Sequence, residues 1–309
     1  MSALYIFLSF VMVFLSFSIC GMLAMWIDRK LTARLQFRVG PPWYQNFADF
    51  IKLIGKETLI PEKANAFMFV ASPVLGLIAT TIAGTIILFI SRTDTGFPAD
   101  AIIVLYLLAV PSIAIILGGS ASGNVLAAVG ISREMKLLLG YELPFICALV
   151  ISAIKSGTTT SLGSIIQFQQ QNGMILGSFS GVIGFIIGVL ALQGKLGLVP
   201  FDLAEAEGEI AGGSLIEYSG ILLGLFKLTK AILFIAGPLF LISLYLGGFS
   251  LSSITGIISG ILKYILILVL FILIRNTNPR LRIDQTLRLF WGWLTLLGFA
   301  GILLAIVGW

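Results

Sequence analysis

The chain has 309 residues, of which 58% are hydrophobic and 11% are charged, with a formal net charge of +5. Soluble domains are roughly 45–50% apolar and about 25% charged, so this composition excludes an ordinary water-soluble fold and favours lipid as the solvent. The chain contains no histidine and only two cysteines, Cys20 and Cys147, so we expect it to bind no haem, metal or iron–sulfur cluster by itself.

Eight apolar stretches are long enough to cross a bilayer, which takes about 20 apolar residues per helix. They cover approximately residues 4–27, 66–90, 101–118, 137–154, 175–194, 215–246, 256–274 and 289–308. We therefore predict an all-α polytopic membrane protein with about eight transmembrane helices, forming a single transmembrane domain over residues 1–309. Residues 101–132 carry no charge, so the span boundaries around 118–137 stay open, with a short re-entrant or amphipathic piece near 120–132 as one alternative.

The distribution of basic residues predicts the orientation of the chain. Fourteen of the 19 basic residues fall in the loops that follow the odd-numbered spans, and two fall in the loops after the even-numbered spans. Cytoplasmic loops carry the excess of lysine and arginine, so we expect loops 28–65 and 195–214 in the cytoplasm, both termini on the outer side, and localisation in the cytoplasmic membrane. No aromatic array is interleaved with these basic residues, so nucleic-acid binding is not expected.

The first cytoplasmic loop contains a predicted surface helix. Apolar residues recur at helical spacing between Phe47 and Ile54, among the charged residues Asp49, Lys52 and Lys56. This pattern is typical of an amphipathic helix lying at an interface. The loop is interpreted either as an ordinary membrane-surface segment or as a docking platform for a soluble partner.

The loop after the fifth predicted span is acidic. It places four carboxylates within eight residues, at Asp202, Glu205, Glu207 and Glu209. Like charges this close favour shared protons or an external cation, and the sequence offers no basic residue between positions 195 and 227. Small and apolar residues between the acids indicate partial burial and favour a functional site, while a solvated acidic loop is the alternative.

Further charged residues fall inside predicted spans or at their start. Glu142 lies near the start of the fourth span, Glu217 opens the sixth, Lys227 and Lys230 follow along it, and Lys263 lies in the seventh. A charge at depth costs roughly 2.5–3.5 kcal/mol on insertion scales, so it usually faces the protein interior or water. We predict a proton path from the cytoplasmic acids through Glu217 and Glu142 toward the two lysines of the sixth span. Snorkelling to the headgroups is the alternative for these charges.

Four motifs together resemble a known family. They are RKLTARLQFRVGPP (29–42), ADFIKLIGKETLIP (48–61), PFDLAEAEGEIAGGSLIEYSG (200–220) and LIRNTNPRLRIDQ (273–285). In these motifs the chain resembles the H subunit of respiratory complex I, which is the membrane heel of that complex, and the equivalent subunit of group 4 membrane-bound NiFe hydrogenases. The segment GISREMKLLLGYELP (130–144) is similar to the hydrogenase-linked members. The first loop lacks an insertion that is usual in complex I members, and related membrane-bound sulfur-reducing complexes share this short layout.

The resemblance implies a non-catalytic role in an oxidoreductase complex. The chain would anchor a soluble electron-transfer arm on the cytoplasmic face and couple its redox chemistry to proton or sodium translocation in antiporter-like membrane subunits. The iron–sulfur clusters and the NiFe centre would belong to the soluble partner subunits. The resemblance assigns coupling to the four acids at 202–209 with Glu142 and Glu217. It assigns docking of the arm to the first loop, at Arg29, Arg34, Arg38, Gly40 and Pro41.

Three alternatives remain open from the sequence. The chain could be the quinone-site subunit of a complex I-type NADH or ferredoxin dehydrogenase, or the equivalent subunit of a sulfur-reducing complex. A stand-alone ion transporter is less favoured, because such proteins typically carry internal repeats and no duplication is evident between residues 1–150 and 151–309.

Overall fold

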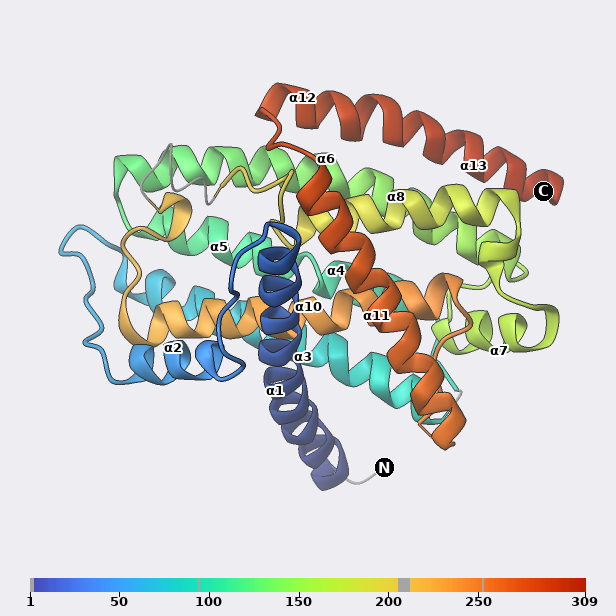
Figure 1. Cartoon of the computed structure of the whole chain (residues 1–309), viewed down its shortest axis with the longest axis horizontal. Helices are drawn as coiled ribbons and strands as arrows, with labels where there is room; N and C mark the ends of the chain where they lie inside the picture. The colour runs from blue at the N-terminus through green and yellow to red at the C-terminus, as the bar shows by residue number, and fades with distance from the viewer. Residues whose placement is uncertain (1–2, 94, 205–211, 252) are drawn as a thin grey trace.

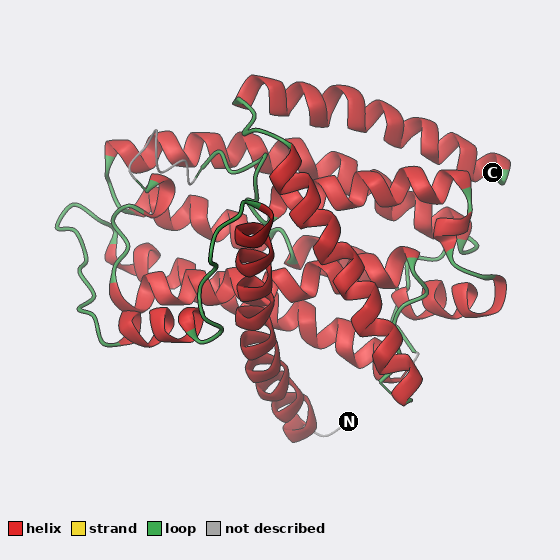
Figure 2. Cartoon of the chain, viewed as in Figure 1, coloured by secondary structure: helices red, strands yellow, loops and turns green. Residues whose placement is uncertain are grey.

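The structure is a computed structural model that describes residues 3–93, 95–204, 212–251 and 253–309. All regular structure within these residues is helical, which confirms the predicted all-α class (Figure 2). The longer helices are α1 (Ala3–Leu35), α3 (Ala66–Thr93), α6 (Val125–Lys155), α8 (Phe179–Lys195), α10 (Gly220–Tyr245) and α11 (Ile254–Thr277). The shorter elements are α2 (Gln45–Ile54), α4 (Asp100–Leu107), α5 (Val110–Ala121), α7 (Leu162–Asn172), η1 (Ile175–Gly177), η2 (Gly213–Leu215), α12 (Ile283–Leu287), η3 (Arg288–Leu294) and α13 (Thr295–Val307).

Seven helical segments in the described part of the chain are long and apolar enough to cross a membrane. They are α1, α3, the pair α4–α5, α6, α10, α11 and the continuous segment Ile283–Val307. The remaining predicted span, 175–194, corresponds to α8, which has 17 residues and is therefore about 26 Å long, slightly less than the roughly 30 Å of a bilayer core. The chain is thus a polytopic membrane protein, and the side on which its termini lie remains a prediction.

Helix α10 is the central helix of the bundle. It is the most buried of the seven spanning segments, and it packs against α1, α3 and α8. Figure 1 shows α6 and α8 side by side, with α13 along their outer face, while α1 and α11 cross α10 steeply. The α1–α10 crossing requires a glycine, because a Cβ at Gly21 would lie 2.2 Å from the carbonyl oxygen of Ala231. Small residues of this kind let membrane helices approach backbone to backbone.

Several predicted boundaries differ from the structure. The third span is divided into α4 and α5, with Pro111 in the first turn of α5. The fourth begins at Val125 rather than near 137, because the Asn124 side chain caps the helix by accepting a hydrogen bond from the Leu126 amide (2.7 Å). The alternative of a separate piece near residues 120–132 is therefore wrong, since most of that stretch forms the first turns of α6.

The predicted amphipathic helix of the first loop is confirmed as α2. Phe50 is partly buried against the main core, whereas Ile51 is 67% exposed and Ile54 is 52% exposed. The helix is attached to α1 by the Asn46 amide, which donates a hydrogen bond to the Met22 carbonyl (2.7 Å). Helix α2 therefore lies against the bundle through one face and leaves apolar side chains uncovered on the other.

Candidate functional site

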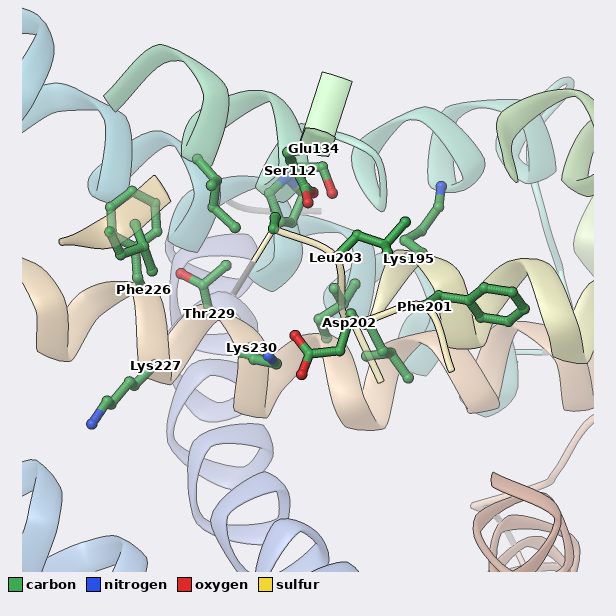
Figure 3. A pocket seen from close by; sticks show the side chains of 17 residues that line it. Ser112, Glu134, Lys195, Phe201, Asp202, Leu203, Phe226, Lys227, Thr229 and Lys230 are labelled. Atoms are coloured by element: carbon green, nitrogen blue, oxygen red, sulfur yellow. The ribbon is translucent and has the colours of Figure 1, made fainter. Parts of the chain in front are cut away.

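A polar cavity of about 80 Å³ lies between α5, α6, α8, α10 and residues 196–204 (Figure 3). A single water needs roughly 10–15 Å³ of such volume, so the cavity has room for several. Its polar lining comes from all five of these parts of the chain. The polar residues are Ser112, Glu134, Lys195, Asp202, Lys227, Thr229 and Lys230. Apolar side chains, including those of Phe201 and Phe226, complete the walls. The bundle thus contains a space that can hold water and has charged side chains in its wall. Residues 196–204 form part of that wall and lead into the acidic segment of the chain.

A buried ion pair adjoins this cavity. Lys195 Nζ lies 2.8 Å from Glu142 Oε1; the lysine side chain is completely buried and the glutamate side chain is 18% exposed. Its ammonium also lies 4.7 Å from the ring centre of Phe145. Lys195 was expected in a cytoplasmic loop, and Glu142 near the start of a span. The expectation for Glu142 is wrong, because it lies in the middle of α6, and Lys195 is the last residue of α8, where it is buried rather than exposed in a loop.

Burial of this pair is difficult to explain by stability alone. Desolvating two charges costs several kcal/mol per ion, and apolar replacements of buried pairs are often neutral or stabilising. In addition, Glu142 Oε2 is buried and accepts no hydrogen bond from any residue that the structure describes. Tyr141 connects the pair to the cavity, since Lys195 Nζ lies 5.4 Å from the centre of its ring and its hydroxyl donates to Ser112 Oγ (2.8 Å). The pair therefore places a charged group in the wall of the cavity, since Lys195 is one of the residues that line it.

Asp202 is neutralised by a cation that is remote in sequence. Its carboxylate oxygen Oδ2 lies 2.7 Å from Arg280 Nη2, across 78 residues of chain. The backbone reinforces this contact, because the Leu281 amide donates to the Pro200 carbonyl (3.1 Å). The sequence offers no basic residue near Asp202, and the structure supplies one from the segment after α11. The other three acids of the loop, Glu205, Glu207 and Glu209, lie outside the described residues.

Glu217 lies apart from the cavity lining. It does not open a helix as expected, but lies in the turn between η2 and α10, where it accepts a hydrogen bond from the Asn124 side-chain amide. The structure therefore attaches Glu217 to the start of α6 rather than bringing it together with Glu142.

The predicted lysines of α10 differ in their surroundings. Lys227 is exposed and Lys230 is half-buried, and both line the cavity (Figure 3). Lys263, on α11, donates instead to the Gly248 carbonyl (2.8 Å) and lies outside the cavity lining. Of the predicted path, the structure brings Asp202, Lys227 and Lys230 to one cavity, with Glu142 joined to it through Lys195.

The first loop is held rigidly while its tip projects outward. The Lys30 ammonium donates to the Gly40 carbonyl (3.1 Å), and the Trp26 indole donates to the Pro41 carbonyl (3.0 Å). Between these anchors Phe37 is 100% exposed and Val39 is 99% exposed. An exposed apolar tip on a fixed loop is typical of a protein-contact surface.

The arginines predicted to dock a partner surround this loop. Arg34 and Arg38 are exposed, while Arg29 donates to the side-chain oxygen of Asn46 (3.1 Å) and so connects α1 to α2. Arg34 and Arg38 are therefore accessible to a partner, whereas Arg29 also has a structural contact. A docking role for all three remains a prediction.

Comparison with known proteins assigns the family. The family model described as NADH dehydrogenase matches residues 8–306. This chain belongs to the NADH dehydrogenase family. The H subunit of NADH-quinone oxidoreductase from Syntrophotalea carbinolica is 33% identical, over 89% of this chain and 87% of that protein. The same subunit from Brevibacillus brevis is 32% identical, over 92% of this chain and 87% of that protein.

A solved structure is also similar over nearly the whole chain. It is a chain of the membrane-bound sulfane sulfur reductase, an archaeal respiratory membrane complex, with a TM-score of 0.87 and 28% identity. The match covers 97% of this chain and 99% of the other. The predicted resemblance to the complex I heel is confirmed, and this NADH dehydrogenase family member is a membrane subunit of a respiratory complex, similar to the H subunit of complex I. Other subunits of such a complex are therefore its partners.

Two charged residues of this NADH dehydrogenase family member were missed by the sequence reasoning. Glu134 is 8% exposed and lines the cavity, although it was noticed only as part of a motif. Its spacing of seven residues from Tyr141 places both on one face of a helix, and this signal could have identified it. Asp28 was assigned to a loop, but it is buried on α1 and pairs with Arg275 of α11. No local pattern indicates that contact.

Proposed function

We propose that this chain anchors a soluble electron-transfer arm on the cytoplasmic side of the cell membrane and couples its redox chemistry to proton or sodium translocation in antiporter-like membrane subunits. The observation that carries the coupling role is the buried Glu142–Lys195 pair beside the polar cavity. Family membership in a respiratory complex supports the anchoring role.

The coupling follows from electrostatics. When Glu142 takes up a proton, the buried ammonium of Lys195 loses its counter-charge, while two further acids, Glu134 and Asp202, line the same cavity as Lys195. Unit charges 4 Å apart interact by roughly 4 kcal/mol at an effective dielectric constant of about 20. A charge change in the cavity, produced by the arm acting on the acidic loop, would therefore change the electrostatic energy of the Glu142–Lys195 pair. Residues 196–204 connect the acidic loop to Lys195 at the end of α8.

The docking surface of the arm is the first loop in this proposal. Phe37 and Val39 would insert into the partner, and Arg34 and Arg38 would pair with acidic groups around it. Apolar anchors surrounded by charges are the usual composition of a protein interface. Arg29, Gly40 and Pro41 would hold the loop in position.

We propose a membrane-bound hydrogenase as the type of complex, with the iron–sulfur clusters and the NiFe centre in the soluble partner subunits and none in this chain. The segment 130–144 supports this type through its similarity to the hydrogenase-linked members, and its Glu134 lines the cavity. Two alternatives have specific support. The relatives are named as subunits of NADH-quinone oxidoreductase, and the structural neighbour belongs to a sulfane sulfur reductase.

Purification of the complex in mild detergent distinguishes these types. Co-purification of subunits containing nickel and iron, with hydrogen evolution from a reduced donor, is the result expected for a hydrogenase. Quinone reduction that is sensitive to quinone-site inhibitors, or sulfane sulfur reduction without nickel, would replace the hydrogenase assignment. Recovery of the chain alone with ion-transport activity would overturn the anchoring role.

The coupling role is tested on the complex reconstituted in liposomes, by measuring ion uptake per electron transferred. Glu142→Gln alone leaves the buried Lys195 unpaired, which costs about 3–5 kcal/mol, so low recovery of the complex is expected. The double variant Glu142→Gln, Lys195→Met removes both charges and should assemble, retain electron transfer and lose ion uptake. Lys263→Met, which removes a cation outside the cavity, is the control and should keep uptake. Normal uptake by the double variant would refute the coupling role.

A further inference from the structure

A second hollow lies on the outer surface of the bundle, between α6 and η3. This groove has a volume of about 710 Å³, and its lining includes Lys136, Leu139, Arg288, Trp291, Gly292 and Trp293. The two tryptophans are 59% and 70% exposed. The groove is therefore a largely apolar surface channel that carries two basic side chains.

The backbone of η3 shapes this groove. Residues Arg288–Leu294 form a π-helix, a conformation that is frequent at functional sites. The Trp291 indole donates to the Leu139 carbonyl (3.0 Å), which ties the segment to α6. A Cβ added at Gly292 would meet no heavy atom within 4 Å. The groove is thus open at its centre and has a fixed wall on either side.

Lys136 and Arg288 lie where charged sequence gives way to apolar sequence. No charged residue follows Arg288, and only Glu142 lies between Lys136 and Lys155. This transition, together with two tryptophans, is typical of the level at which a membrane protein meets the headgroups. Both basic side chains are exposed, and neither takes part in an ion pair among the residues that the structure describes.

The acids near the groove do not neutralise it. Glu134, on the same helix as Lys136, is buried and lines the polar cavity instead. Asp284, on α12, is exposed and is not part of the groove lining. The groove therefore combines a net positive charge with an apolar floor, and only a ligand with one anionic end and one apolar end complements both.

We propose that this groove binds an anionic phospholipid. The phosphate of the headgroup lies against Lys136 and Arg288, and an acyl chain lies along Leu139, Trp291 and Trp293. Basic pockets between membrane helices bind acidic headgroups in this way, and each nearby basic residue contributes about fivefold in affinity. A zwitterionic lipid has no net negative charge to complement Lys136 and Arg288. An apolar helix of another subunit would leave both cations without a partner.

Photo-crosslinking on the purified complex tests the site. The probes are phosphatidylglycerol and phosphatidylcholine carrying a diazirine in one acyl chain, each added to the complex in mild detergent. The phosphatidylglycerol probe is expected to label peptides containing Leu139, Trp291 or Trp293, with much weaker labelling by phosphatidylcholine. Equal labelling by the two probes, or labelling only elsewhere on the chain, overturns the proposal without any variant being made.

Matched variants test the basic end and the apolar part of the site separately. Lys136→Gln and Arg288→Gln should each reduce labelling at subsaturating probe by about fivefold. Gly292→Leu fills the groove and keeps both charges, and it should also abolish labelling. Arg92→Gln removes an exposed basic residue at the end of α3 and should change nothing. Unchanged labelling in the three groove variants refutes the site. Loss of another subunit from the Gly292→Leu complex, with labelling retained, would instead identify the groove as a protein contact.

Discussion

Arg275 Nη1 lies 2.5 Å from Asp28 Oδ2, and this ion pair joins α1 to α11 across 247 residues of chain. The aspartate side chain is 7% exposed and the arginine 31%. The pair holds the last turns of α1 against α11, and the first loop continues from that end of α1.

Breaking this pair should therefore loosen the first loop. Asp28→Asn should lower the free energy of unfolding by about 1.5–3 kcal/mol, the usual contribution of a charged hydrogen bond. The measurement is the thermal unfolding midpoint of the purified complex. Asp284→Asn, at an exposed acid, is the control and should leave the midpoint unchanged. An unaltered midpoint in Asp28→Asn would show that the pair is not structurally important.

The contact between Asp202 and Arg280 should be required for coupling. Arg280→Gln releases residues 196–204 from the segment after α11, so ion uptake per electron should fall while electron transfer continues. The exchange variant Asp202→Arg, Arg280→Asp restores the opposite charges and should recover part of the uptake. If Arg280→Gln behaves like the wild type in liposomes, the pair has no role in coupling.

The α1–α10 crossing should not tolerate a larger residue at its closest point. Gly21→Ala places a methyl group 2.2 Å from the carbonyl oxygen of Ala231, and overpacking of this kind typically costs about 1–3 kcal/mol or more. The expected result is a lower unfolding midpoint and reduced recovery of the complex. Gly177→Ala is the matched control, because its added Cβ meets no heavy atom within 4 Å. Similar midpoints for the two variants would contradict the close crossing.

The exposed tip of the first loop should bind the soluble arm. Phe37→Asp puts a charge at a fully exposed apolar position, so it should release the soluble subunits while the membrane subunits remain associated. Size-exclusion chromatography in detergent, with identification of the subunits in each peak, provides the measurement. Glu62→Gln, at an exposed position of the same loop, should retain the arm. Retention of the arm in Phe37→Asp would exclude the tip as a contact.

Sequence reasoning was most successful where the physical signal was local. Long apolar stretches predicted the helical membrane class because lipid requires every backbone polar group to be bonded within a helix. The amphipathic helix α2 was predicted because apolar residues between Phe47 and Ile54 recur at helical spacing. The four motifs predicted the family, and the comparisons confirmed it.

Contacts between remote residues could not be predicted in the same way. Lys195 was counted as a loop cation because its neighbours in sequence do not reveal Glu142, which is 53 residues away. Asp202 has no basic residue near it in sequence, since Arg280 is 78 residues away. In both cases the partner is brought close by packing of the helix bundle, which a short stretch of sequence does not reveal.

The crossing of α1 and α10 at Gly21 and Ala231 also has a consequence for biosynthesis. The ribosome adds about 210 residues between the two contact points, which takes roughly 10 to 40 seconds at ordinary elongation rates. During that interval the small-residue surface of α1 faces lipid or the insertion machinery without its native neighbour. Helix α1 is thus synthesised well before α10 and reaches this part of its final packing late, although α3, its other large neighbour, is made soon after it.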